Sequence, residues 1–126
     1  MRKEKEFDWK AILEENLRTG YSELLILQLL SEKDMYGYEL TEEILARTDK
    51  AFYFSEGAMY LTLIRMHTRG LVSQYRQIVT GKRFRTYYHL EEFGKQYLEY
   101  GKKQWLSIYG TVSKILKTGA DDHEEQ

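Results

Sequence analysis

Residues 55–90 read SEGAMYLTLIRMHTRGLVSQYRQIVTGKRFRTYYHL and contain a helical pattern followed by two strand-like patterns. Ser55 is suited to cap a helix over 56–69. Segments 71–79 and 82–90 alternate in side-chain character and are rich in β-branched and aromatic residues, which is typical of a β-hairpin. The stretch therefore predicts a helix followed by a two-stranded ribbon.

The charge of this stretch differs from that of the rest of the chain. The 126 residues carry 19 Lys and Arg and 20 Asp and Glu, which gives a net charge of −1. From Gly57 to Leu90 there is no acidic residue. The cations in that segment are Arg65, Arg69, Arg76, Lys82, Arg83 and Arg85. Because a solvated face usually mixes both signs, this pattern predicts a surface that faces a polyanion.

The helix over 56–69 is expected to have two different faces. Met59, Leu63 and Met66 recur at i, i+4 and i+7, and we expect them to point into the core. The second face is small, polar and cationic. It consists of Ser55, Ala58, Thr62, Arg65 and Arg69.

Three shorter helices are expected upstream. Asp8 can cap an amphipathic helix, and Ser22 opens a second helix in which apolar residues through Leu30 cover nearly every side. Such a helix must be buried almost all round. Asp34 is expected to cap a third helix over 35–47.

Downstream of the ribbon the apolar period is again helical, over 91–117. A seven-residue repeat places five apolar residues on one seam, namely Leu98, Trp105, Ile108, Val112 and Ile115. We expect this seam to mediate dimerisation, because a long helix with an apolar seam requires a partner. A second stripe of Phe93, Tyr97 and Tyr100 is expected to pack on the chain's own helices. The acidic tail, 118–126, is expected to be disordered.

The order of helix, helix, short link, helix and hairpin is expected for a winged helix-turn-helix domain. The predicted fold class is mainly α with a small β-hairpin (α+β), followed by a long C-terminal helix. We expect an N-terminal helical arm at 1–20, a winged helix-turn-helix DNA-binding domain at 21–90, a dimerisation helix at 91–117 and the acidic tail.

The candidate DNA contacts lie on the helix over 56–69, on the hairpin and on the preceding helix. They are Ser55, Ala58, Tyr60, Thr62, Arg65, Arg69, Lys82, Arg83, Arg85 and Tyr38. Small residues early in a helix let its backbone approach base edges, and arginines suit phosphates or a guanine edge. The tyrosines, including Tyr36, either bond phosphate through the hydroxyl or pack their rings in the core. The wing cations either contact phosphates or are ordinary solvated charges.

Four motifs, in this order, resemble the PadR-type transcriptional regulators. They are Tyr36-Gly37-Tyr38-Glu39-Leu40, then Ser55-Glu56-Gly57 with Met59-Tyr60, then Arg69-Gly70-Leu71-Val72, and finally Tyr87-Tyr88 with Leu90 and Gly94. The resemblance covers most of the chain and the length is similar to that of the short subfamily. It implies a homodimeric DNA-binding repressor that a small molecule often releases from DNA.

The chain departs from the resembled pattern at several positions. The family usually has Thr at the place of Ala58, Pro at the place of Leu61 and Leu-Glu at the place of Met66-His67. These changes concern base specificity and leave the fold intact. Glu91 replaces the customary Thr cap of the last helix, and we expect its carboxylate to serve as that cap.

The resemblance also implies a second role for Trp105, in binding a ligand. In multidrug-sensing members of the resembled family, a tryptophan at this position lines a flat pocket at the dimer centre. Trp105, Gly101 and Ile108 are therefore candidate contacts for a planar hydrophobic or phenolic effector. The alternative is a dimer core that Trp105 fills without a cavity. Gly101 either leaves room for a ligand or lets the helices approach closely.

We therefore expect a cytoplasmic, dimeric regulator that represses transcription by binding double-stranded DNA at a palindromic operator. The alternative is a winged-helix module that serves protein association without specific DNA binding. No catalytic constellation, metal site or cofactor motif is recognised, so an enzyme is not expected. The longest apolar run, Leu24 to Leu27, is far shorter than the roughly 20 residues of a membrane span.

Overall fold

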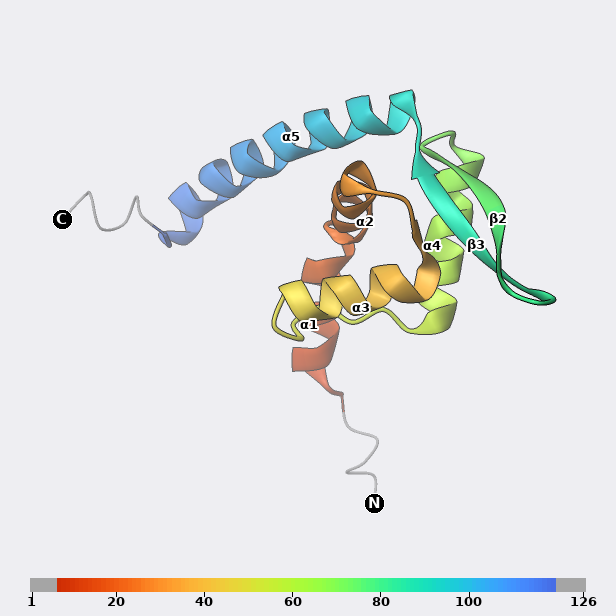
Figure 1. Ribbon diagram of the computed structural model, residues 1–126. Helices are drawn as coiled ribbons and strands as arrows, with labels where there is room; N and C mark the ends of the chain where they lie inside the picture. Colours follow the sequence, from red (N-terminus) through yellow and green to blue (C-terminus); the bar gives the residue numbers. More distant parts are fainter. Residues whose placement is uncertain (1–6, 120–126) are drawn as a thin grey trace, which may run out of the picture.

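The computed structural model describes residues 7–119 of the chain. Within this range five helices and three strands form the predicted α+β winged-helix architecture (Figure 1). They are α1 Trp9–Thr19, α2 Ser22–Glu32, β1 Met35–Tyr36, α3 Gly37–Arg47, α4 Glu56–Thr68, β2 Val72–Thr80, β3 Arg83–Leu90 and α5 Glu92–Leu116. Residues 1–6 of the predicted arm and 120–126 of the predicted tail lie outside the described residues.

Two of the predicted helix caps are confirmed. Asp8 Oδ1 accepts a hydrogen bond of 3.2 Å from the Ala11 amide at the start of α1. Ser55 Oγ accepts one of 3.1 Å from the Ala58 amide at the start of α4. Each bond satisfies one of the amide groups that the first turn of a helix leaves without a partner, which fixes where these helices begin.

The prediction for the start of the third helix is wrong. Met35 and Tyr36 form a short strand, β1, that pairs antiparallel with Tyr88 and Tyr87 of β3, and α3 begins only at Gly37. Asp34 therefore does not cap a helix. Burial of the Met35 side chain and pairing with a strand far along the sequence outweigh the local preference for a helix here.

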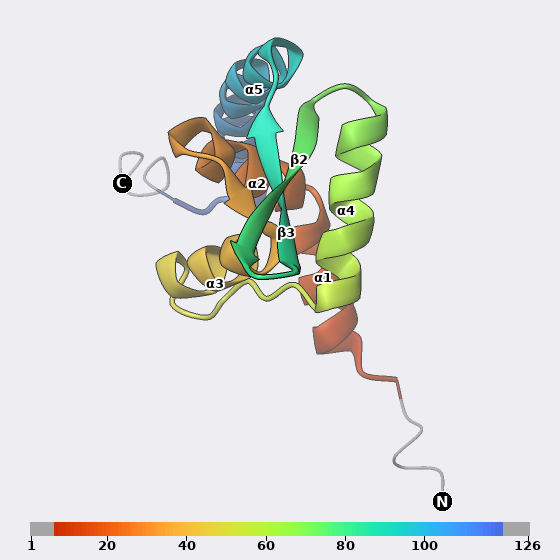
Figure 2. The same cartoon turned by 45° about the vertical axis from the view of Figure 1, so that its right-hand side comes forward.

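The sheet has the strand order β1-β3-β2, and β2 and β3 form the predicted hairpin. Gly81 takes a positive φ of 48° at the turn, and the register shifts between Ile78 and Thr80. Tyr88 and Leu90 at the base are buried, whereas the distal part of both strands is exposed. The hairpin thus projects from the body as a twisted wing beside α4 (Figure 2).

The hydrophobic core lies between α2, α3, α4 and the base of the sheet. Its buried apolar residues are Ile26, Leu27, Leu29, Leu30, Met35, Leu40, Ile44, Phe54, Met59, Leu63, Met66, Leu71, Val72, Tyr88, Leu90 and Leu98. The helix α2 supplies residues on several of its sides, as predicted, and Leu24 and Leu25 are partly buried against the cluster.

The face of α5 that packs on the chain's own body differs from the prediction. Leu98 was expected at a dimer interface, but it is only 2% exposed and belongs to the core. A Cβ at Gly94 would overlap the Leu71 carbonyl oxygen, and one at Gly101 would lie 2.6 Å from Leu24 Cδ2. These two glycines let α5 approach the body closely, so their side of the helix faces inward.

The second stripe of α5 is exposed as a consequence. Phe93 and Tyr100 are 51% and 66% exposed, so the prediction that the stripe packs on the chain's own helices is wrong for these two. Tyr97 is 37% exposed and does contact the body, because its hydroxyl donates to Glu23 Oε1 of α2 at 3.2 Å. The expected cap at Glu91 is also wrong, because its side chain makes no capping hydrogen bond.

The C-terminal half of α5 extends past the body of the protein (Figure 1). The apolar residues exposed on this half include Trp105, Ile108, Tyr109, Val112, Ile115 and Leu116. None of the residues of α1 is buried, although this helix carries apolar side chains at Trp9, Ile12, Leu13 and Leu17. Within residues 7–119 no helix has the length and apolar character needed to cross a membrane.

Candidate nucleic-acid interface

The helix α4 packs on the core through one side only. Met59, Leu63 and Met66 are buried, as the sequence predicts. Thr62 was expected on the polar face, but it is only 5% exposed, and its hydroxyl donates a hydrogen bond of 2.8 Å to the Ala58 carbonyl oxygen. The prediction that Thr62 lies on an open face is therefore wrong, since the core extends further round α4 than the apolar pattern indicates.

The two arginines predicted on α4 have different surroundings. Arg65 is exposed, and its guanidinium donates to Thr62 Oγ1 at 3.3 Å. Arg69 donates to Glu23 Oε1 at 2.8 Å and lies over the Tyr97 ring, with Cζ at 5.6 Å from the ring centroid. The hydrogen bond from Arg69 to Glu23 raises the pKa of the guanidinium above its ordinary value. Arg69 therefore ties α4 to α2 and α5, while its contact with DNA stays a prediction.

The outer side of α4 carries the predicted contact Tyr60 together with two apolar residues, Leu61 and Ile64, that the sequence analysis did not select. Tyr60, Leu61 and Ile64 are 59%, 56% and 41% exposed. A Cβ at Gly57 would meet no atom within 4 Å, so the helix backbone is open there. A helical projection centred on all four buried residues, with Thr62 included, would have identified this side.

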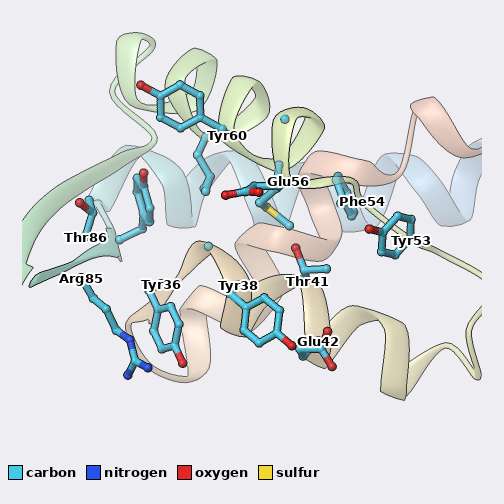
Figure 3. Close-up of a pocket in the computed structure, with 15 residues that line it drawn as sticks. Tyr36, Tyr38, Thr41, Glu42, Tyr53, Phe54, Glu56, Tyr60, Arg85 and Thr86 are labelled. Carbon is cyan, nitrogen blue, oxygen red and sulfur yellow. The ribbon is translucent and has the colours of Figure 1, made fainter. Parts of the chain in front are cut away.

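A cleft of about 790 Å³ lies between α3, α4 and β3. Figure 3 shows Tyr60 of α4, Tyr36 of β1, Tyr38 of α3 and, at the wing end, Arg85. Tyr38 and Tyr60 are 67% and 59% exposed, so their rings are open to solvent rather than packed in the core, whereas Tyr36 is half-buried. The cleft also contains the carboxylates Glu42 and Glu56, which the sequence analysis did not select.

The wing carries a group of exposed cations. Arg76, Lys82, Arg83 and Arg85 are all exposed, and within residues 7–119 none of them is paired with a carboxylate. Arg85 Cζ lies 4.2 Å from the centroid of the Tyr36 ring. Stacking on aromatic rings orients the guanidinium groups and leaves their N–H groups available for an anion.

Polar and aromatic contacts hold the base of the wing. Asp34 Oδ2 accepts a hydrogen bond of 2.7 Å from the Tyr75 hydroxyl, and Asp34 Oδ1 lies 2.8 Å from His89 Nδ1. Tyr87 stacks on Tyr75 at a centroid distance of 5.7 Å and meets the edge of Tyr36 at 5.4 Å. The wing is therefore fixed to β1 and to the loop before it.

The same contacts alter two pKa values. Burial acts to raise the pKa of Asp34, but the hydrogen bonds from His89 and Tyr75 outweigh it and hold the pKa below its ordinary value. The hydrogen bond to Asp34 and burial both raise the pKa of Tyr75. Asp34 is therefore charged and Tyr75 protonated at neutral pH, which is the combination the hydrogen bond requires.

A second cleft, of about 700 Å³, lies under α5. Trp105 lines it together with Gly101, Ile108 and Leu17. The Trp105 ring stacks on Tyr109 at 6.0 Å and meets Tyr21 edge-on at 6.2 Å. The structure thus places the candidate effector residues in one cleft, and Gly101 also allows the close contact of α5 with α2.

The fold and this site define a winged-helix regulator with a long C-terminal helix. Residues 26–100 match the model of the transcriptional regulator PadR-like family, and the chain belongs to that family. Its members are transcriptional regulators, which are generally not enzymes.

Solved structures of regulators are similar to the chain. A PadR family transcriptional regulator from Eggerthella lenta has a TM-score of 0.77 at 26% identity over 89% of this chain and 96% of that one. A PadR family regulator from Clostridium difficile has a TM-score of 0.67 at 33% identity over 76% and 98%. Bacillus subtilis PadR in complex with operator DNA has a TM-score of 0.58 at 24% identity over 67% and 45%, a likeness of fold.

Proposed function

We propose that the protein is a dimeric repressor that binds a palindromic DNA operator through α4 and the wing. The observation that carries this proposal is the group of exposed cations on the wing, which pair with no carboxylate within residues 7–119 and belong to a hairpin that lies beside α4 (Figure 2). An α-helix fits the major groove, and cations next to it suit the flanking phosphates. The B. subtilis relative was solved with operator DNA, which supports the same use of the fold here.

Dimerisation is proposed through the exposed apolar residues of α5. Trp105, Ile108 and Val112 are 43%, 58% and 45% exposed on the half of α5 that extends past the body, where they line the cleft shared with Leu17 and Tyr21. Burying side chains of this size stabilises an interface by about 1.5–3 kcal/mol each before the costs of association. In such a dimer the two α4 helices would lie about 34 Å apart to reach successive major grooves.

The experiment is a titration of labelled duplex from upstream of the protein's own gene, with random-sequence duplex as the competitor. We expect saturable binding that weakens steeply with salt. Charge reversal of Arg83 and Arg85 should weaken binding to all sequences and reduce the salt slope by about two per protomer. Reversal of Lys102 and Lys103 on α5 makes the same change in net charge away from the wing and is the matched control.

Two results would contradict the proposal. Equal affinity for upstream and random duplex would exclude sequence-specific binding and favour the protein-association module. A single-subunit mass in analytical ultracentrifugation would exclude the dimer. Repression itself is tested with a reporter gene behind the same upstream duplex, where expression should rise when the regulator gene is deleted.

We also propose that a small-molecule effector binds in the cleft that Trp105 lines and relieves repression. A Trp9→Phe variant leaves Trp105 as the remaining tryptophan, so its fluorescence reports on this cleft alone. Planar hydrophobic cations or phenolic acids should quench that fluorescence and release the labelled duplex. An unchanged signal would indicate that Trp105 only fills the dimer core.

A further inference from the structure

The outer side of α4 has an apolar centre. The buried residues Met59, Thr62, Leu63 and Met66 define the inner side, and Leu61 and Ile64 project from the opposite side. Leu61 also borders a cleft between α1 and α4, yet more than half of its surface is exposed. These two side chains therefore stand where a groove-bound helix would present residues to base edges.

The surroundings of this apolar centre match a DNA groove better than a protein surface. Gly57, one turn before Leu61, leaves the backbone open to an approaching surface. Arg65 is exposed beside Leu61 and Ile64, and the wing adds four more cations. An apolar strip that is bordered by unpaired positive charge is complementary to base edges that are bordered by phosphates.

The major groove presents one kind of apolar group, the C5-methyl group of thymine. The other groups at the base edges are hydrogen-bond donors or acceptors, and Leu or Ile against them would leave them without partners. An apolar side chain at the centre of the helix thus favours thymine and disfavours the other bases.

We propose that Leu61 and Ile64 select operators that carry thymine at the positions facing the middle of α4, by contact with the thymine methyl groups. This inference rests on the proposed function and names the chemistry by which that function distinguishes sequences. It assigns specificity to the two apolar side chains at the centre of this side of the helix.

The test replaces thymidine by deoxyuridine, which removes the methyl group and keeps every hydrogen-bonding atom. The duplex is the tightest binder selected from a random library, and each thymine is replaced in turn. Loss of one buried methyl contact should weaken binding about fourfold. Substitution at thymines outside the α4 contact should leave the affinity unchanged.

Variants of the protein locate the effect. In Leu61→Ala and Ile64→Ala the difference between the thymidine and deoxyuridine duplexes should shrink toward none at one position each, with the salt slope unchanged. Ile12→Ala removes an apolar side chain that is 45% exposed on α1, outside both α4 and the wing, and should keep the full difference. The measurement on the unaltered protein needs no variant and so does not depend on variant folding.

The possible failures are distinct. If selection from the library yields no preferred sequence, the proposed function is wrong. If a preferred sequence emerges and deoxyuridine binds as tightly as thymidine throughout, the repressor proposal stands and the thymine inference is overturned. A methyl effect that persists in both α4 variants would also overturn the assignment to these residues.

Discussion

Asp34 and Tyr75 are joined by a hydrogen bond of 2.7 Å that connects the loop before β1 to the first strand of the wing. The same carboxylate also meets His89, so one side chain contacts both wing strands. The orientation of the wing relative to α4 therefore depends on a residue that lies outside both elements.

Replacing Asp34 by Asn should loosen the wing, because an amide is uncharged and forms weaker bonds with Tyr75 and His89. We expect a loss of about 1 kcal/mol in the free energy of unfolding, since the group is partly solvated. Hydrogen exchange should accelerate in β2 and β3 and stay unchanged in α2. Unchanged exchange in both strands would contradict the anchoring role.

The contribution of Asp34 to the free energy of unfolding should be larger at neutral pH than at low pH. Its pKa in the folded protein lies below the ordinary value of 3.8, so the folded state binds the proton more weakly than the unfolded state. The stabilisation is therefore fully present above that ordinary value and is lost as the pH falls through the folded pKa. Urea unfolding of the protein and of Asp34→Asn should converge at low pH and differ at neutral pH.

Replacing Gly57 by Ala should raise the stability of the protein and lower its affinity for DNA. The added Cβ meets no atom within 4 Å, and Ala favours the helix over Gly by up to about 1 kcal/mol. Thermal unfolding should therefore shift upward, while the affinity for the selected duplex falls because the methyl group blocks close approach of the backbone. A tighter complex would indicate that this turn does not face the DNA.

Replacing Gly94 by Ala should be strongly destabilising. The new Cβ would overlap the Leu71 carbonyl oxygen and the Leu90 side chain, so α5 must shift away from the sheet. Overpacking of this kind costs about 1–3 kcal/mol, measurable by urea unfolding. Gly110→Ala on the same helix is the control, because a Cβ there meets nothing within 4 Å and should stabilise the helix slightly.

Arg69 and Arg83 should behave differently when they are neutralised. Arg69→Gln removes the ion pair with Glu23 and should lower stability by at most about 1 kcal/mol while leaving the salt slope of DNA binding unchanged. Glu23→Gln should lower stability equally, and the double variant should add little further loss. Arg83→Gln should do the reverse, with unchanged stability and a smaller salt slope.

Much of the fold follows from local sequence signals. The caps Asp8 and Ser55, the alternation in the hairpin and the core stripe of α4 each depend on residues close together in the chain. The features that the sequence analysis missed depend on distant partners. The strand β1 exists through its pairing with Tyr87 and Tyr88, and Asp34 takes its role from the same strands.

The errors at the candidate site have a similar origin. The sequence analysis gave Arg69 no partner, because Glu23 lies 46 positions earlier in the chain and helical periodicity does not relate residues that far apart. The inward side of α5 is set by Gly94 and Gly101. A search for apolar side chains does not find this side, because glycine has no side chain. Leu61 and Ile64 were missed because an apolar residue is ordinarily assigned to the core.

The junction between the wing and α5 has a mechanical consequence. A single residue, Glu91, separates the last strand from a helix of 25 residues, and Gly94 is wedged against the sheet. Such a helix is about 37 Å long, and it acts as a rigid lever whose N-terminal end is fixed to the wing. In a pair of subunits joined at the far ends, a tilt of about 10° between the levers would displace the wings by roughly 6 Å, about one turn of helix pitch.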